Sequence, residues 1–146
     1  SLDVSENMIL PQVETAADIF IEGWSFGHSV NQNTEELEDC INKLISRTIN
    51  LVKPAGDIIL IESLGTNTEE PVYYTESLKS LYFALENTFG FKRTTLRTDY
   101  EYENSEDASR IMGFFFGDEM KNDIILNNKS IIREFTGVWH LKKKEK

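Results

Sequence analysis

Two short apolar stretches, separated by one amphipathic stretch, set the pattern of the first half of the chain. Residues 18–21 and 58–61 are mostly aliphatic, and they end on the carboxylates Glu22 and Glu62. Runs this short and apolar predict buried strands rather than helices. Between them, apolar side chains recur at spacings of three and four, which predicts a helix with one buried face: Leu37, Cys40, Ile41, Leu44, Ile45, Thr48, Ile49 and Val52.

Local signals bound this helix and set the geometry of the two strands. Asn33 is expected to cap the helix, and the segment 53–56, with its proline and glycine, is expected to end it. A strand, a helix and a strand in this order require a parallel pair with a right-handed crossover. We therefore expect Glu22 and Glu62 to lie at the same carboxyl edge of one sheet, where Gly23 lets a ligand or backbone approach closely.

The second half of the chain repeats the alternation with less regular signals. Thr75 is expected to cap a second helix, whose apolar face contains Leu78, Leu81, Tyr82, Leu85 and Phe89. Extended strands are predicted within residues 91–102 and 131–141, and these two are expected to be antiparallel neighbours. Between them we expect a helix capped by Ser105 and a short helix from Asp118 to about Leu126. Four aromatic residues are expected in the core: Phe114, Phe115, Phe116 and Trp139.

These elements predict an α/β fold in a single domain spanning residues 1–146. The expected sheet has parallel strands with a carboxyl-terminal antiparallel pair, and helices on both faces. Apolar residues make up 40% of the chain, which suits a globular domain of this length.

Charge and composition exclude several classes of partner. The formal net charge of −10 argues against a nucleic-acid partner, because phosphate binding needs a basic surface. The basic run 142–146 is expected to be a solvated tail. No apolar run approaches the roughly 20 residues of a membrane span. The single Cys40 fits a reducing, cytoplasmic location and is expected to be a small buried hydrophobe.

Several segments, in this order and spacing, resemble class I S-adenosylmethionine-dependent methyltransferases. Residues 10–11 and 17–24 (Leu-Pro and Ala-Asp-Ile-Phe-Ile-Glu-Gly-Trp) are similar to that family's fourth strand and the loop before it. Residues 51–62 resemble the segment leading into the fifth strand, with Ala55 where a second glycine is usual. Phe89-Gly90-Phe91 resembles the entry to the sixth strand.

The resemblance implies a partial Rossmann-like sheet whose last strand lies between the family's fifth and sixth strands. The family's glycine-rich cofactor loop and the acidic residue that closes its second strand have no counterpart in the sequence. Since a βα unit takes roughly 30 residues, about 70 to 90 residues of the cofactor half are expected to be absent. The chain therefore resembles the carboxyl-terminal part of a methyltransferase.

The resemblance also implies roles for individual residues. Glu6 and Asn7 are placed toward the adenine of S-adenosylmethionine, and Gly23 and Trp24 beside its methionine portion. His28 is implied to orient or deprotonate the methyl acceptor, since a neutral imidazole accepts protons near pH 7.

Glu62, Tyr74 and Tyr100 are implied to line the acceptor side of the site. For each of these candidate residues, an exposed or purely structural role stays open as an alternative. No metal-ligand pattern is predicted.

The leading hypothesis is therefore transfer of a methyl group from S-adenosylmethionine to an unidentified acceptor. The strand near Ile19 would have a bare edge, which favours a homodimer or a separate cofactor-binding chain. One alternative is a non-catalytic interaction module that binds a partner through the acidic edge at Glu22 and Glu62. A Rossmann-like nucleotide binder and a stable fragment without a function of its own are further alternatives.

Overall fold

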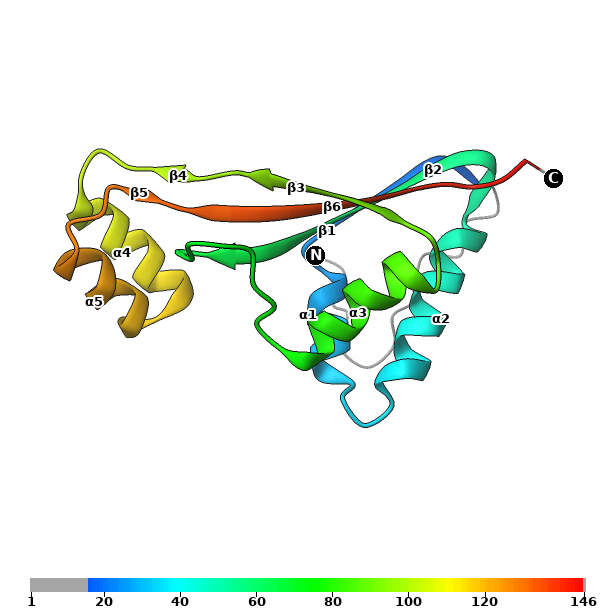
Figure 1. The fold of residues 1–146 in the computed structure, drawn as a ribbon, viewed down its shortest axis with the longest axis horizontal. Coiled ribbons are helices and arrows are strands. Elements are labelled where there is room, and N and C mark those ends of the chain that lie inside the picture. Colours follow the sequence, from blue (N-terminus) through cyan, green and yellow to red (C-terminus); the bar gives the residue numbers. More distant parts are fainter. Residues whose placement is uncertain (1–15, 146) are drawn as a thin grey trace. The chain divides into compact units, whose positions relative to one another are not determined.

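The computed structural model describes residues 16–145, in which strands and helices alternate along the chain (Figure 1). In chain order, the elements are β1 (Ala17–Gly23), α1 (Phe26–Gln32), α2 (Leu37–Asn50), β2 (Val52–Thr66), α3 (Glu76–Asn87), β3 (Lys92–Arg97), β4 (Tyr100–Glu101), α4 (Ser105–Phe116), α5 (Asp118–Leu126), β5 (Ile131–Ile132) and β6 (Glu134–Lys142). The fold is therefore mixed α/β, as the hydrophobic pattern predicts.

The described residues group into two compact units. The first unit contains residues 16–62, 73–95 and 137–145, and the second contains residues 63–72 and 96–136. The first unit holds α1, α2 and α3, and the second holds α4 and α5.

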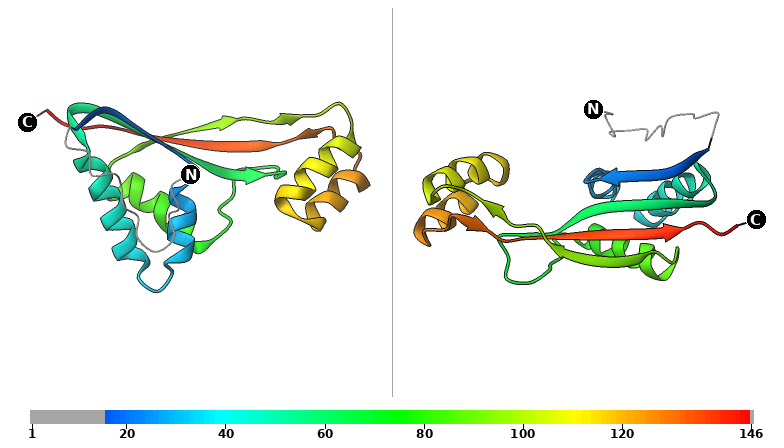
Figure 2. Two further views of the ribbon diagram at one scale, coloured as in Figure 1. Left: turned by 180° about the vertical axis from the view of Figure 1, so that it is seen from behind. Right: turned by 90° about the horizontal axis from the view of Figure 1, so that it is seen from above.

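The main sheet has four strands in the order β1-β2-β6-β3 (Figure 2, right). β1 and β2 are parallel, and Ile21 pairs with Ile59 and Glu22 with Leu60. The predicted parallel pair is confirmed. The last strand, β6, lies between β2 and β3, which is the position expected for the final strand. A separate two-stranded sheet joins β4 and β5 in antiparallel pairing.

In the first unit, the helices cover one face of the sheet. α1, α2 and α3 lie on the same side of the strands in Figure 1. The burial pattern of β2 agrees, because Ile58, Leu60 and Glu62 are buried while Ile59 and Ile61 are only partly covered. The expectation of helices on both faces is therefore wrong for the first unit. This alternation is typical of a sheet packed on one side only.

Several element boundaries differ from the predicted ones. The short helix α1 occupies residues 26–32, for which the sequence pattern predicts no element. Asn33 ends α1 instead of capping the next helix, because α2 begins at Leu37 with Glu36 at its N-cap. β2 continues four residues beyond Glu62, to Thr66, and so extends past the end of the predicted strand. Thr75 caps α3 as predicted, and its hydroxyl accepts the Leu78 N–H at 3.1 Å.

The core of the first unit is built around a buried pair of aromatic rings. Tyr82 of α3 stacks on Trp139 of β6 with the ring centroids 4.4 Å apart. Both side chains are fully buried, and the indole Nε1–H of Trp139 donates to Glu86 Oε1 at 3.0 Å. The prediction that Trp139 belongs to the core is confirmed, and its one polar atom has a partner, as buried indoles require.

The second unit has a smaller core between α4 and α5. Its fully buried members are Ala108, Met112, Ile124 and Ile132. Asn104 caps α4 by accepting the Asp107 N–H at 2.8 Å, so the predicted cap at Ser105 is wrong by one residue. The predicted bounds of α5 are confirmed.

The three consecutive phenylalanines of α4 are exposed rather than buried. Phe114 is 83% exposed and Phe115 is 70% exposed, and Phe116 is also on the surface. Their assignment to the core is therefore wrong. A helix of this length has one buried stripe, and Ala108 and Met112 occupy it.

Lys142 and Lys143, the first two residues of the basic carboxyl-terminal run, are bound to other residues, so the prediction of a solvated tail is wrong for them. The ammonium group of Lys143 donates to the carbonyl oxygens of Ile49 (2.8 Å) and Val52 (2.6 Å), and its N–H donates to Gly56 O. Lys142 pairs with Asp57 at 2.8 Å. Lys143 thus satisfies carbonyls at the end of α2, where a cation is favoured by the helix dipole.

Candidate functional site

The carboxyl end of β1 turns directly into α1, and Glu22 holds this turn. One oxygen of its buried carboxylate, Oε1, accepts three hydrogen bonds: from Ser25 N–H at 2.6 Å, from the Ser25 hydroxyl at 2.8 Å and from Phe26 N–H at 3.1 Å. Ser25, the N-cap residue, makes no capping bond with its own side chain. The strand-end carboxylate therefore satisfies N–H groups that open the helix.

Glu62 reaches the same helix terminus from the neighbouring strand. Its Oε1 accepts the Gly27 N–H at 2.9 Å, and its side chain is buried. An alanine Cβ at Gly27 would lie 3.0 Å from Glu62 Oε2 and 2.9 Å from Leu78 Cδ2, so these two side-chain ends would have to shift to admit it. The prediction that Glu22 and Glu62 come together on neighbouring parallel strands is confirmed, but Glu62 is not at the end of its strand, since β2 continues to Thr66.

The two carboxylates lie close together in a buried site, where two negative charges are unfavourable. Burial and then the neighbouring charge of Glu22 together raise the pKa of Glu62 to about 8. The N–H groups of Gly27 and Phe26 act in the opposite direction, since they favour a carboxylate. At neutral pH the pair therefore retains a proton, and both side chains serve the helix terminus rather than open solvent.

Gly23 and Trp24 form the open part of this strand end. A Cβ added at Gly23 would meet nothing within 4 Å, and the Trp24 side chain is 55% exposed. Trp24 has a left-handed backbone with φ of 56°, which is uncommon for a residue other than glycine. Its N–H donates to Ile61 O at 2.9 Å, which extends the parallel pairing and holds this conformation. The indole is thereby presented at the sheet edge.

The other predicted site residues are dispersed. His28 is exposed on α1, one helical turn beyond the end of β1. Tyr74 is exposed next to Thr75, whose hydroxyl donates to Asn31 Oδ1 of α1 at 2.7 Å. Tyr100 is exposed on β4 of the second unit. Glu6 and Asn7 lie outside the described residues.

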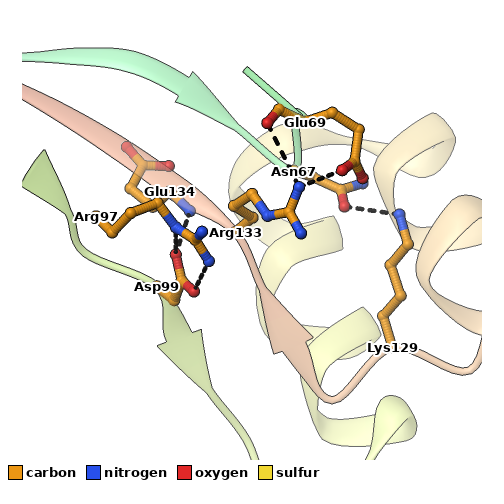
Figure 3. Close-up of polar contacts among 7 residues, drawn as sticks. All are labelled: Asn67, Glu69, Arg97, Asp99, Lys129, Arg133 and Glu134. Carbon is orange, nitrogen blue, oxygen red and sulfur yellow. Dashed lines mark hydrogen bonds and ion pairs between the residues drawn. The ribbon is translucent and has the colours of Figure 1, made fainter. Parts of the chain in front are cut away.

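A second polar site, within the second unit, has no signal in the sequence. Figure 3 shows Arg97, Lys129 and Arg133 with the carboxylate and amide residues around them, which come from three segments of the chain: 67–69, 97–99 and 129–134. They border a cavity of about 230 Å³ lined by Asn67, Thr68, Glu69, Arg97, Asp99, Lys129, Ile131 and Arg133. Because these residues span 67 positions of the chain, from 67 to 133, no local motif predicts their meeting.

A larger groove of about 550 Å³ separates α2 from α3 in the first unit. Its lining includes the apolar Leu37, Ile41 and Phe83 and the charged Glu38, Glu76 and Lys79. Phe83 is exposed on the α3 side. The groove has a mixed apolar and charged lining without a convergent set of polar groups.

The described residues contain neither a candidate metal site nor a candidate membrane-spanning helix. Over residues 16–145, no group of three or more histidine, cysteine, aspartate or glutamate side chains has a geometry that could hold a metal ion. Within the same range, no helix is both long and apolar enough to cross a bilayer. No protein-family model, no curated protein and no solved structure matches this chain.

Proposed function

We propose that this chain supplies the methyl-acceptor side of an S-adenosylmethionine-dependent methyltransferase site. The observation that carries the proposal is the strand order β1-β2-β6-β3, in which the last strand lies between β2 and β3. The sequence resemblance predicts this insertion, and consecutive pairing of neighbouring strands would not produce it. The parallel pairing of β1 and β2 supports the same reading.

The strand end at Gly23 and Trp24 suits the methionine portion of the cofactor. Gly23 leaves open space, and Trp24 presents an exposed indole next to it. An aromatic face attracts a cation such as a sulfonium. When bound, S-adenosylmethionine supplies a methyl group on a positively charged sulfur, already activated for displacement.

The chain's own residues then act mainly by positioning. Alignment of the acceptor and exclusion of water contribute most to such a displacement. His28 is exposed on α1, where its imidazole can accept a proton from an acceptor hydroxyl or amine. Glu22 and Glu62 hold α1 in place, so we assign them a positioning role.

The proposal includes a partner at the free edge of the sheet. β1 is an edge strand, and Ile19 and Ile21 are 57% and 63% exposed. An apolar edge strand is a template for pairing with another strand. We therefore assign this edge to a second copy of the chain or to a separate cofactor-binding chain.

Calorimetric titration tests the cofactor assignment directly. S-adenosylmethionine and S-adenosylhomocysteine are titrated into the purified chain while its mass in solution is recorded. Micromolar binding that is lost in Trp24→Leu, but kept in Phe83→Leu on α3, supports the proposal. The control residue is exposed and aromatic but lies in the α2–α3 groove. Binding that is equal in both variants contradicts the assignment of Trp24.

The edge assignment has its own test. Ile21→Lys is expected to lower the mass of any assembly to that of the monomer, because an edge lysine opposes strand addition. Phe83→Lys is the matched control, since it adds the same charge at an exposed apolar residue away from β1. A wild-type chain that is monomeric at micromolar concentration argues against self-pairing.

A non-catalytic interaction module is the second candidate. It is favoured by the exposed Phe114, Phe115 and Phe116 of α4, whereas the burial of Glu22 and Glu62 argues against their acidic edge as its binding surface. An absence of heat with either cofactor form, together with association through β1, would favour this module over the methyltransferase reading.

A further inference from the structure

Three cationic side chains converge on the 230 Å³ cavity of the second unit. Arg97 is at the end of β3, Lys129 follows α5, and Arg133 precedes β6 (Figure 3). The chain as a whole carries 25 acidic and 15 basic residues. Three basic side chains around one small cavity therefore depart from the general charge of the molecule.

Arg97 is held rigidly at one side of this cavity. Its Nε donates to Asp99 Oδ1 at 2.8 Å, and its Nη2 donates to Asp99 Oδ2. The guanidinium also lies 5.5 Å from the centroid of the Phe135 ring. Asp99 itself accepts the Glu134 N–H at 3.1 Å. Within residues 16–145, Nη1 of Arg97 makes no hydrogen bond, so this nitrogen can donate to a ligand.

Lys129 is fixed on the opposite side. Its ammonium group donates to Asn67 Oδ1 and Asp123 Oδ2, both at 2.8 Å. Asn67 donates in turn to Asp123 Oδ2 at 2.7 Å, and its backbone N–H donates to Arg133 O at 2.7 Å. This triangle anchors the first residue of the segment 67–69.

Arg133 differs from the other two because its counter-ion, Glu69, is almost fully exposed. Its Nη1 donates both to the Glu69 carbonyl (3.4 Å) and to Glu69 Oε2. The Glu69 side chain is 88% exposed, whereas Asp99 and Asp123 are more covered. Nε and Nη2 of Arg133 have no hydrogen-bond partner in the described part of the chain. An exposed carboxylate bound through one nitrogen contributes little to stability and is readily exchanged.

The charges around the cavity favour replacement of Glu69 by another carboxylate. The hydrogen bond from Arg97 lowers the pKa of Asp99 to about 2, and the one from Lys129 lowers the pKa of Asp123. Both therefore remain ionised with their partners. Burial raises the pKa of Glu134, which disfavours its charged form. Without Glu69, Asp99 and Asp123 would stay paired with Arg97 and Lys129, and the Arg133 guanidinium would be left without a carboxylate partner.

We propose that this cavity binds a small organic carboxylate, which replaces the Glu69 side chain on Arg133 and also accepts from Arg97 Nη1. A planar guanidinium matches a carboxylate through two parallel hydrogen bonds, whereas Glu69 uses only one nitrogen. The cavity volume lies below the 300–1,000 Å³ of drug-sized sites, so the ligand is expected to have few heavy atoms. This inference does not rest on the proposed methyl transfer, and cofactor titration leaves it unchanged.

Nuclear magnetic resonance of the full ¹⁵N-labelled chain tests the site. Sodium succinate, inorganic phosphate and sodium chloride are titrated separately at matched ionic strength. Succinate is expected to give saturable shifts at the side-chain Nε–H of Arg133 and at the amides of residues 67–69. Chloride is expected to give none. Saturation by phosphate without saturation by succinate overturns the carboxylate assignment.

Two variants with opposite expected effects sharpen this test. Arg133→Gln is expected to weaken succinate binding at least about tenfold, since a charge-assisted bidentate contact is lost. Glu69→Gln is expected to tighten it about two- to fivefold, because the competing exposed ion pair is removed. Arg110→Gln, an exposed arginine that pairs with Asp107 on α4, is the control and should leave binding unchanged. Since Glu69 is almost fully exposed, its variant should fold normally, and unchanged or weaker binding in it overturns the proposal.

Discussion

Glu22 and Glu62 lie on neighbouring parallel strands, and both carboxylates accept hydrogen bonds from backbone N–H groups at the start of α1. Glu22 takes those of Ser25 and Phe26, and Glu62 takes that of Gly27. The short helix is therefore held at its N-terminus by two acidic residues 40 positions apart in sequence. A helix of seven residues is marginal alone, so its position depends on this pair.

The stability of the first unit should fall as the pH rises from 5 to 8. The folded pKa of Glu62 is raised from 4.5 to about 8, so the folded chain retains a proton that the unfolded chain releases. This contribution is complete below about pH 4.5 and is lost as the pH rises through 8, with a slope of up to about 1.4 kcal/mol per pH unit. Urea denaturation followed by tryptophan fluorescence measures it, because Trp24 and Trp139 both lie in this unit.

In Glu62→Gln this slope should disappear, and the variant should be more stable than the wild type at pH 8. The amide keeps an oxygen for the Gly27 N–H and cannot ionise. Glu101→Gln on the exposed strand β4 is the control and should keep the slope. A wild-type chain whose first unit becomes more stable between pH 5 and 8 would show that Glu62 is ionised throughout.

Gly27→Ala and Gly23→Ala should differ although both add one methyl group near the same strand end. At Gly27, the added Cβ would lie 2.9 Å from Leu78 Cδ2 and 3.0 Å from Glu62 Oε2. This overpacking should cost about 1–3 kcal/mol in the free energy of unfolding. At Gly23 the Cβ meets nothing within 4 Å, so the change should stay within about 0.5 kcal/mol. Equal effects in urea denaturation would contradict the close approach of Glu62 to α1.

The carboxyl group of Asp99 should titrate near pH 2. Its pKa is lowered from 3.8 by the hydrogen bond from Arg97 and then by the Glu134 N–H. Because the folded pKa is lowered, its stabilising contribution is present above pH 3.8 and is lost as the pH falls through 2. In Arg97→Gln the midpoint should rise toward 3.8, while Arg110→Gln should leave it unmoved. Carbon resonances of the carboxyl group, followed against pH, give both midpoints.

Substitutions on the two faces of α4 should separate buried from exposed positions. Met112→Ala should destabilise the second unit by about 2–5 kcal/mol, because Met112 packs against Ala108, Ile124 and Ile132. Phe115→Ala should change stability by no more than about 0.5 kcal/mol, since Phe115 is exposed. Hydrogen exchange of the α4 and α5 amides reports this unit, which contains no tryptophan. A loss of stability in Phe115→Ala as large as that in Met112→Ala would show that Phe115 is buried.

The elements that can be predicted from the sequence are those whose local signals agree. β1 and the central part of β2 are short apolar runs, and α3 has both a threonine cap and a continuous apolar face. The meeting of Glu22 and Glu62 follows from parallel pairing alone. These features depend on neighbours close in sequence or on one general rule of chain crossover.

The features that cannot be predicted depend on distant partners. α1 contains Gly27 and has no cap from its own N-cap side chain, and one of the two carboxylates that hold its N-terminus, Glu62, lies 35 residues away from Gly27. The cavity beside Arg133 is built from segments that begin at Asn67 and end 66 residues later. In α4, the apolar spacing includes Phe115 and Phe116, but a short two-helix unit buries only one narrow stripe. Periodicity identifies the apolar positions of a helix, but it does not show which of them pack against another element.

The place of β6 between β2 and β3 constrains how the chain is synthesised. During translation, β1, β2 and β3 leave the ribosome well before residues 134–142. The facing edges of β2 and β3 therefore stay without their neighbour until residues 134–142 have emerged. Unpaired edges of this kind are prone to join with other chains. Newly made molecules should accordingly depend on chaperones most strongly in the interval just before β6 is released.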